Sequence, residues 1–244
     1  MGRPKYPRIY RIPHPSGYRH GTKRYLTLEE LREVFSGRIY VEEKLDGSQF
    51  SVMKEKGEVV LYSRGANIVR RFEPLGYKGI WRWVYEHYES FSKLPERYVL
   101  YGEWLRVRHT VPYDALPDWA VIFDVLDLEA RRFLSYEEKA RLLDELELVY
   151  PPLLDVMELE CRTRRDVKEV IKRLARIASQ PSRYSTVARS MEGVVVKNYA
   201  KGLFAKLINP WFDIEVEESE LFRGGLKFNS LARQPYAARR APRP

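Results

Sequence analysis

Residues 38–49 read "RIYVEEKLDGSQ". β-Branched and aromatic residues precede Lys44 and favour a strand over 38–43, while Asp46-Gly47 is a turn signal. The stretches 48–55 and 58–64 repeat the strand pattern and are separated by the turn signal "KGE". We therefore expect an antiparallel meander over 38–64, in which Lys44 stands beside a tight turn and can project into a cleft between sheets.

The rest of the chain mixes strand and helix patterns without a regular β-α-β alternation. This mixture predicts an α+β fold with mainly antiparallel sheets. Further strands are expected over 97–107, 119–129, 191–199 and 203–209, and helices over 79–94, 135–148 and 163–179. Ser135 followed by Glu138 is a capping-box pattern, which places the start of the second helix.

Length and composition are those of a globular chain with a core: 244 residues, 44% hydrophobic and 32% charged. The longest apolar stretch, "WAVIFDVL", is far shorter than the ~20 residues of a membrane span. The N-terminus has no apolar run of a secretory signal. Cys161 is the single cysteine, which excludes an internal disulfide and fits a reducing compartment. We expect a cytoplasmic protein that does not cross a membrane.

The net charge of +9 is concentrated at the two ends of the chain. Residues 1–24 carry seven Lys/Arg and residues 223–244 carry six, and neither stretch has an acidic residue. Such ends, rich in Tyr, Pro and Arg, suit a polyanion through counterion release and stacking on bases; solubility alone is the alternative. We expect a basic N-terminal arm over 1–24, a main domain over 25–215 and a basic tail over 216–244 without a domain of its own.

Several kinds of site are excluded by missing patterns. The chain has no G-x-x-x-x-G-K-[ST] and no G-x-G-x-x-G, so it has neither a P-loop nor a dinucleotide fingerprint. Cys161 and the four scattered histidines do not have zinc spacing, and His109 in "RVRHT" is assigned to packing or to the surface. Lys44 remains either a solvated turn lysine or a nucleophile. Desolvation or nearby cations that lower its pKa would favour the nucleophile.

Five motifs follow Lys44 in order: "YSRG" (62–65), "YGEW" (101–104), "FDV" (123–125), "MEGVVVK" (191–197) and "FAKLIN" (204–209). The series resembles the motif set of the covalent nucleotidyltransferases, which include ATP-dependent DNA and RNA ligases and mRNA capping enzymes. "YGEWL" and "YDALPDWAVIFDV" resemble RNA ligases of the RNA ligase 2 type and their small bacterial and archaeal relatives. The resemblance implies two antiparallel sheets flanked by helices around a nucleotide cleft, as in the ATP-grasp-like ligase fold.

The resemblance also implies a chemistry. Lys44 would attack the α-phosphate of ATP, hold AMP, and pass it to a nucleic acid 5′-phosphate, from which a 3′-hydroxyl displaces it. Glu192 would hold Mg²⁺ (or Mn²⁺) through water, and Lys206 would neutralise the α-phosphate. The implied catalytic residues are Lys44, Glu192 and Lys206.

Further residues would bind the nucleotide. Arg64 would contact the sugar or the incoming phosphate, Glu103 the ribose, and Phe123 the adenine; a structural Arg64–Glu103 ion pair and a core role for Phe123 are the alternatives. The implied nucleotide-binding set is Glu42, Lys44, Asp46, Gly47, Arg64, Glu103, Phe123, Glu192, Lys197 and Lys206.

The chain departs from the family pattern in three ways. The RNA ligase 2 branch has histidine at the position of Asp46, whereas DNA ligases have aspartate there. Gln49 in turn favours RNA ligases, because DNA ligases typically have arginine at its position. The last motif lacks a second lysine, for which Lys197 and Lys201 are candidates. The 32 residues after Phe212 are too few for an OB domain, so a stand-alone nucleotidyltransferase domain is expected.

The resulting interpretation is an ATP- and Mg²⁺-dependent ligase that joins RNA through lysyl-AMP, with RNA favoured over DNA as partner. A minimal DNA nick ligase, a capping guanylyltransferase and a non-catalytic nucleic-acid-binding protein on a degenerate ligase scaffold are the alternatives. Monomer and homodimer are both left open.

Overall fold

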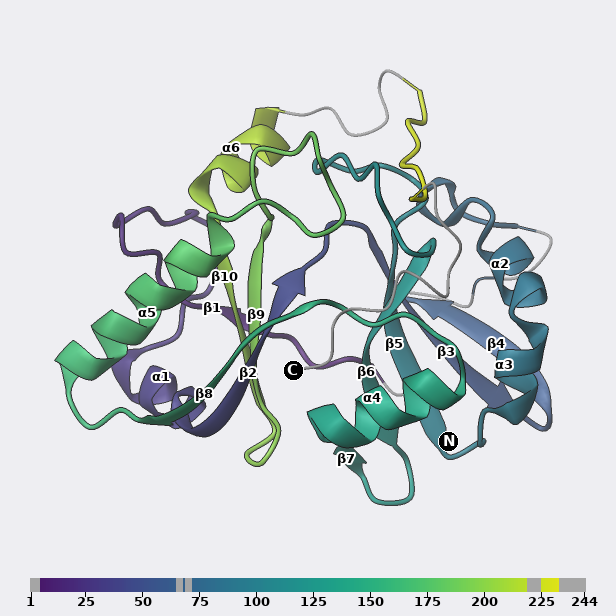
Figure 1. Ribbon diagram of the computed structural model, residues 1–244, viewed down its shortest axis with the longest axis horizontal. Coiled ribbons are helices and arrows are strands. Elements are labelled where there is room, and N and C mark those ends of the chain that lie inside the picture. The colour runs from purple at the N-terminus through teal and green to yellow at the C-terminus, as the bar shows by residue number, and fades with distance from the viewer. Residues whose placement is uncertain (1–4, 65–67, 69–71, 219–224, 233–244) are drawn as a thin grey trace.

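The computed structural model describes residues 5–64, 68, 72–218 and 225–232, and two five-stranded sheets form its framework (Figure 1). The first has the order β1-β10-β9-β2-β8 and the second β4-β3-β5-β6-β7. Every strand pair is antiparallel except β1 with β10. The predicted α+β class with mainly antiparallel sheets is confirmed. None of the described helices is long and apolar enough to cross a membrane.

The elements have the following bounds. The first sheet comprises β1 (Tyr10–Arg11), β2 (Ser36–Lys44), β8 (Leu153–Glu160), β9 (Gly193–Asn198) and β10 (Leu203–Ile208). The second comprises β3 (Ser48–Glu55), β4 (Glu58–Ser63), β5 (Tyr98–Trp104), β6 (Ala120–Asp127) and β7 (Arg132–Phe133). The helices are α1 (Leu28–Val34), α2 (Ile80–Glu86), α3 (Tyr88–Lys93), α4 (Tyr136–Glu145), α5 (Arg164–Ala178) and α6 (Pro210–Glu218), with a 3₁₀ turn at Leu75–Tyr77.

The predicted meander over 38–64 is wrong at its first turn. β2 pairs with β8 and β9, whereas β3 pairs with β4 and β5, so residues 45–47 carry the chain from one sheet to the other. Leu45 and Asp46 are buried at this crossing. Gly47 has no room for a side chain, because a Cβ there would lie 2.4 Å from the carbonyl oxygen of Trp104. A local turn signal does not reveal which sheet the next strand joins, since strand partners are set by long-range packing.

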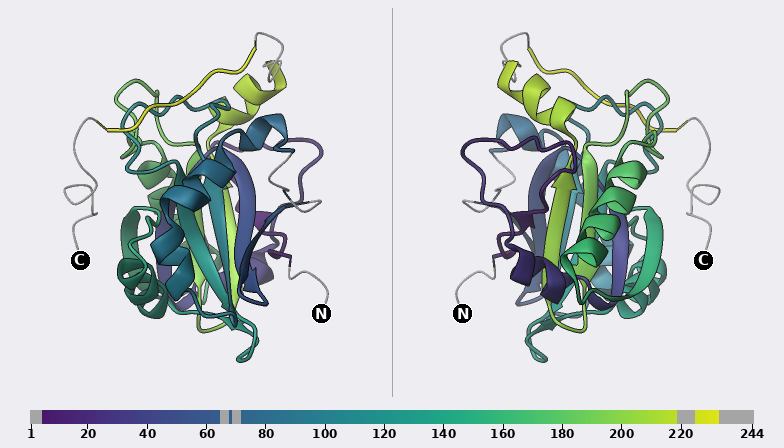
Figure 2. Two further views of the ribbon diagram at one scale, coloured as in Figure 1. Left: turned by 90° about the vertical axis from the view of Figure 1, so that its right-hand side faces the viewer. Right: turned by 90° about the vertical axis from the view of Figure 1, so that its left-hand side faces the viewer.

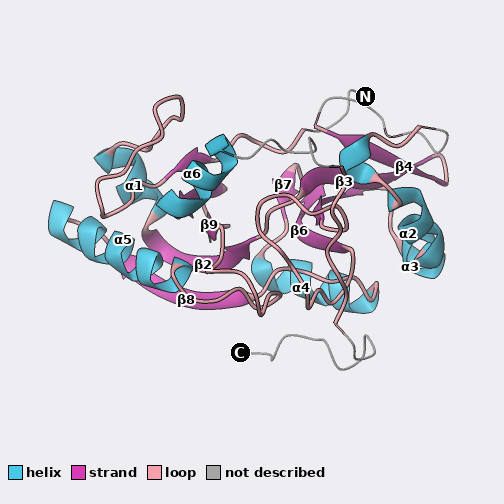
Figure 3. Cartoon of the chain, turned by 90° about the horizontal axis from the view of Figure 1, so that it is seen from above, coloured by secondary structure: helices cyan, strands magenta, loops and turns pink. Residues whose placement is uncertain are grey.

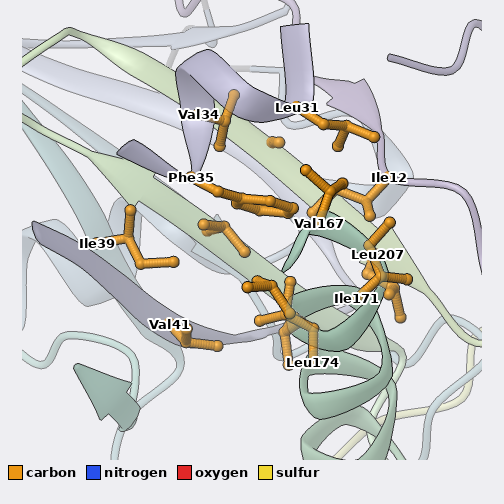
Figure 4. Close-up of a cluster of buried hydrophobic side chains, with 14 of the residues drawn as sticks. Ile12, Leu31, Val34, Phe35, Ile39, Val41, Val167, Ile171, Leu174 and Leu207 are labelled. Carbon is orange, nitrogen blue, oxygen red and sulfur yellow. The ribbon is translucent and has the colours of Figure 1, made fainter. Parts of the chain in front are cut away.

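The outer face of the first sheet is closed by α1 and α5. α5 presents Val167, Ile171 and Leu174 to Phe35, Ile39 and other apolar side chains, which form one core (Figure 4). The helix lies where the 3.6-residue spacing of its apolar residues predicts it. The charged side chains of Glu42, Lys197 and Lys206 alternate with these core residues along their strands and therefore point to the other face.

Helices α2 and α3 cover the second sheet, and they replace the single helix predicted over 79–94. The helix is interrupted at His87, whose backbone N–H bonds to carbonyl oxygens of α2. The imidazole Nε2 of His87 lies 3.1 Å from Asp118. Helix α4 begins at the predicted capping box of Ser135 and Glu138. Figure 3 shows α4 alongside β6, and its side chains also contact Tyr40 and Glu42 of β2.

The two basic ends lie on the domain as far as they are described. β1 adds to the first sheet beside β10, and Ile12 is buried in its core. Residues 225–232 bond to the connection between β5 and β6 through bridges at Phe228 and Leu231, at the end of the molecule that α6 also occupies (Figure 2). The predicted domain boundaries stay predictions, and residues 1–4, 219–224 and 233–244 of the predicted ends lie outside the described part.

Candidate active site

A cleft of about 600 Å³ opens between the two sheets. Of the site residues predicted from sequence, Glu42, Lys44, Arg64, Glu103, Phe123, Lys197 and Lys206 line it. Gly47 contacts Glu103 and Glu192 contacts Lys44, whereas the Asp46 carboxylate binds backbone N–H groups of the connection between β5 and β6. The N-terminal segment also lines the cleft, through residues 5–11 and 22–24, which were predicted to form a basic arm.

Strand register explains why residues far apart in sequence face the same cleft. Glu42 on β2 lies opposite Val195 on β9, which lies opposite Lys206 on β10, which lies opposite Arg11 on β1. Directly opposed residues in a sheet share one face. Lys44 follows Glu42 by two residues and therefore points to the same face. Glu42, Lys206 and Arg11 thus place charged side chains on this face from three of the four strands.

Lys44 is partly buried at the end of β2 and is held in place by two contacts. Its Nζ lies 3.1 Å from Glu192 Oε2 and donates to the carbonyl oxygen of Leu45 at 3.1 Å. Burial alone would lower the pKa of Lys44, but the carboxylates of Glu192, Glu103 and Asp46 outweigh it and raise the pKa above its usual value. The expectation of a lowered pKa is therefore wrong for the free protein, in which Lys44 is an ammonium ion.

Glu192 and Lys206 are the other two residues predicted to be catalytic. Glu192 is 5% exposed, and burial raises its pKa to about 7 against the opposing pull of Lys44. Burial, and then the positive charge of Lys44, lower the pKa of Lys206 to about 8. Arg11 and Arg64 act on Lys206 in the same direction. This crowding of cations makes the site a place where a polyphosphate would relieve repulsion.

Glu103 and Arg64 belong to the wall that the second sheet forms. Gly47 donates its backbone N–H to Glu103 Oε1 at 3.1 Å, and burial raises the pKa of Glu103. Arg64 donates from Nε to Gln49 Oε1 at 2.6 Å. Gln49 lies opposite Glu103 in the register of β3 and β5. Arg64, which bonds to Gln49, and Glu103 are therefore neighbours on the same wall of the cleft.

A buried charge network joins the two sheets beneath the cleft. Glu42 pairs with Lys139 of α4, and its Oε2 lies 2.7 Å from the Nζ of Lys197. Lys197 Nζ also lies 2.9 Å from Asp124 Oδ1. Both lysines donate to the carbonyl oxygen of Phe123, at 2.9 Å from Lys139 and 2.6 Å from Lys197. The charges of two buried acids and two buried lysines therefore offset one another.

This network includes Lys197, which also lines the cleft. Its ammonium group donates to Asp124 and to the Phe123 carbonyl oxygen and forms an ion pair with Glu42, and its predicted role at the phosphates stays a prediction. Lys201, the other candidate for the missing lysine of the last motif, pairs with Glu33 outside the cleft. The cation next to Lys206 is Arg11, which is held by a bidentate pair with Asp213 of α6.

Phe123 lines the cleft beside the network that fixes its carbonyl group. Tyr6 of the N-terminal segment lies against it, with ring centroids 5.1 Å apart and nearly perpendicular planes. The Tyr6 hydroxyl donates to Asp124 Oδ2 at 2.5 Å. The aromatic side of the cleft is thus built from both the second sheet and the N-terminal segment.

A metal site made only of protein groups is not present in the described part of the chain, which has no cluster of three or more His, Cys, Asp and Glu. Mg²⁺ commonly keeps several waters and binds one or two carboxylates together with substrate phosphates. The buried carboxylate of Glu192 beside the cationic cleft fits that mode. Its role as a metal-binding residue stays a prediction.

Four residues of the site were missed from sequence: Tyr6, Arg11, Asp124 and Lys139. Asp124 lies within the quoted motif "FDV", where only Phe123 was assigned a role. Lys139 follows buried Tyr136 and precedes buried Leu143 at helical spacing, so the periodicity of α4 could have placed it inward. Tyr6 and Arg11 carry no such signal, because nothing local indicates that the N-terminal segment returns to the cleft.

Comparisons with known proteins found one matching family model and several similar solved structures. The family model for RNA ligase matches residues 37–208. A structure of Naegleria gruberi RNA ligase with PPi is similar at a TM-score of 0.58 and 19% identity, over 79% of this chain and 55% of that chain. A variant of the same enzyme with ATP and Mn gives 0.58 and 18%, and one with AMP and Mn gives 0.53 and 18%, with the same coverage.

These structural likenesses show the fold, and the chain spans about half the length of the Naegleria protein. None of the curated proteins matches the chain in sequence.

Proposed function

The chain belongs to the RNA ligase family, and on that premise we propose that it is an ATP-dependent ligase joining 5′-phosphate and 3′-hydroxyl ends of RNA. The observation that carries the proposal is the position of Lys44. Its amine lies at the crossing between the sheets, against Glu192, on the face of the cleft that also carries Lys206. A binding surface alone has no need of a buried lysine–carboxylate pair at this point.

In the proposed reaction Lys44 Nζ attacks the α-phosphorus of ATP, and the bond to pyrophosphate breaks. AMP then passes from Lys44 to the 5′-phosphate of the nucleic acid, and the 3′-hydroxyl displaces AMP to form the phosphodiester bond. Lys206 and Arg64 offset the charge that gathers on the phosphate oxygens. Phe123 offers its ring to the adenine, and Glu103 accepts hydrogen bonds from the ribose.

Lys44 must lose a proton before it can attack, because the three nearby carboxylates hold it as an ammonium ion. A Mg²⁺ ion held through water by Glu192 would supply positive charge that weakens this hold and neutralises the phosphates. The structures of the Naegleria enzyme with ATP and Mn support a nucleotide and a divalent metal as cofactors here. The residues of the chain that would act on the amine are Glu192 and Lys206.

RNA is the proposed partner, bound through the cleft and the basic ends. Lys5, Arg8 and Lys23 are exposed residues of the cleft lining, so a phosphate backbone can reach them. Family membership and Gln49 favour RNA over DNA, whereas Asp46 favours a DNA nick ligase, which is the second candidate. The free thiol of Cys161 supports a cytoplasmic location as part of the same proposal.

The test is joining by the purified protein of 5′-phosphorylated RNA and DNA, single-stranded and nicked, with ATP or GTP and Mg²⁺. The proposal expects joined RNA with ATP, labelling of the protein by ATP and not GTP, and loss of both in Lys44→Ala. Joining confined to nicked DNA would establish the second candidate. Binding of RNA without labelling, after any AMP already bound has been removed with pyrophosphate, would contradict the enzyme.

A further inference from the structure

His109 lies next to the crossing that carries Lys44, although its sequence context indicated only packing or surface exposure. It belongs to the connection between β5 and β6. Its Nε2 lies 3.2 Å from the hydroxyl oxygen of Ser48, and its Nδ1 lies 3.9 Å from Asp46 Oδ1. Asp46 and Ser48 follow Lys44 by two and four residues, so the imidazole faces the segment that positions the nucleophile.

The connection that carries His109 is fixed to that segment. Asp46 Oδ2 accepts the backbone N–H groups of Thr110 at 2.7 Å and Val111 at 2.8 Å. The backbone N–H of Asp46 donates in return to the hydroxyl of Tyr113 at 2.8 Å. With three bonds between the two segments, the imidazole has a defined position relative to Lys44.

The environment of the imidazole suits a proton acceptor. Burial, and then the positive charge of Lys44, lower the pKa of His109, so the ring is neutral at neutral pH. The charged groups near the ring include Lys44, whose positive charge lowers the pKa of His109, and Asp46, whose Oδ1 lies 3.9 Å from Nδ1. With the proton on Nδ1, the nitrogen nearer the Asp46 carboxylate, Nε2 is the nitrogen that accepts from the hydroxyl of Ser48.

The surroundings of His109 also suit the end of a nucleic acid strand. Phe228 is 52% exposed, and the guanidinium of Arg106 lies 5.6 Å from its ring. Arg108 bonds through its backbone N–H to Lys227, which adds two more cations to this rim. An exposed aromatic ring beside several cations suits a single strand, which binds through its phosphates and a stacked base.

We propose that His109 accepts the proton of the terminal 3′-hydroxyl in the sealing step, with Asp46 and Ser48 positioning the imidazole. The inference rests on the proposed function. The 3′-oxygen forms a bond to the 5′-phosphorus of the adenylylated end, and its proton passes to Nε2, directly or through the hydroxyl of Ser48. The bond from phosphorus to the AMP oxygen breaks, and AMP leaves with its electron pair. Attacking and leaving oxygens lie roughly in line in phosphoryl transfer, so the hydroxyl enters from the side away from the nucleotide.

The test uses RNA that already carries the 5′-adenylyl group, joined by the full-length protein without ATP. His109→Gln should slow this joining by about 10²-fold or more, the usual contribution of a general base. AMP attachment to Lys44 from ATP should stay within about threefold of the wild type, because the imidazole takes no part in it. Sealing of adenylylated RNA by His109→Gln at the wild-type rate would overturn the inference. So would an equal loss of Lys44 labelling and sealing.

A matched control and a second variant distinguish a specific role of His109 from a general effect on the fold. His87→Gln removes another half-buried histidine that pairs with an aspartate, Asp118, outside the site, and it should leave both measurements unchanged. His109→Gly should regain sealing when imidazole is added, with a pH profile that follows the pKa of the added base. Failure of added imidazole to restore sealing in a folded His109→Gly protein would contradict the role.

The two proposals fail separately. If the wild type is not labelled by ATP and does not seal adenylylated RNA, the proposed function fails. If the wild type does both and His109→Gln matches it, only this inference fails.

Discussion

Replacing Lys139 by methionine tests the buried charge network that joins the two sheets. The Lys139 side chain is fully buried, pairs with Glu42 and donates to the carbonyl oxygen of Phe123 at 2.9 Å. Methionine keeps most of the apolar stem but removes the charge and both bonds. The network then holds Glu42 and Asp124 against Lys197 alone, which leaves one negative charge without a partner in the interior.

The expected loss follows from that imbalance. Removing one partner of a buried ion pair costs about 3–5 kcal/mol, because the other charge stays desolvated. Glu42→Gln leaves the opposite imbalance and should also destabilise the fold. The double variant Lys139→Met/Glu42→Gln has equal numbers of positive and negative charges in the network. Its loss in free energy of unfolding should therefore be about 2 kcal/mol smaller than the sum of the two single losses.

The assay is urea unfolding of the four proteins, with the KM for ATP in the labelling reaction as a second readout. KM should rise in Lys139→Met because the Phe123 backbone loses one of its two lysine bonds. Lys172→Met is the matched control: its pair with Glu169 is exposed, and surface pairs are worth about 0–1 kcal/mol. A Lys139→Met loss no larger than that of the control, or strictly additive single effects, would refute the reasoning.

Three further predictions follow from the same geometry. Gly47→Ala should destabilise the protein by about 1–3 kcal/mol, because a Cβ there meets a backbone oxygen of β5. Thermal unfolding measures the effect, and an unchanged Tm would contradict the close approach of residues 45–47 to β5. Arg11→Met should lower the free energy of unfolding in urea by about 3–5 kcal/mol, because the buried carboxylate of Asp213 loses its partner. A decrease under 1 kcal/mol would count against the pair. A hydrogen bond from Arg132 and the backbone of the capping box lower the pKa of Glu138 from 4.5 to about 2. The stability that Glu138 supplies is therefore present above pH 4.5 and lost as pH falls to 2, so Glu138→Gln should be less stable than the wild type at pH 7 and equal to it near pH 2; a constant difference across this range would be inconsistent.

Much of the element order could be predicted from the sequence, since local patterns determine local structure. The apolar spacing of 163–179 and the capping box at Ser135 predicted α5 and α4, and both are confirmed. The pairing of β2 could not be predicted from Asp46-Gly47, because the same dipeptide serves a hairpin or a crossing between sheets. The break at His87 was also missed, and its imidazole pairs with Asp118, a residue distant in sequence that no local pattern indicates.

The candidate site shows the same division. Ordered motifs predicted that Lys44, Glu103 and Lys206 face one cleft, and the register of the strands brings them there. What the motifs could not supply is the charge state of each group. Lys44 was expected to have a lowered pKa from burial, but the carboxylates that gather around it come from three separate elements and reverse the direction.

The N-terminal segment was the least predictable part of the site. Its basic composition indicated a polyanion partner, but not that β1 would add to the sheet and place Arg11 beside Lys206. Parallel pairing of two residues leaves no sequence pattern of its own. Tyr6 reaches Phe123 by the same long-range return of the chain.

The central claim is that the amine of Lys44 becomes covalently bound to AMP. Incubation of the protein with ATP and Mg²⁺, followed by digestion and mass spectrometry, locates the modified residue directly. The account predicts an acid-labile AMP on the peptide that contains Lys44, removed by pyrophosphate and absent in Lys44→Arg. AMP on any other lysine, or its presence in Lys44→Arg, would contradict the account.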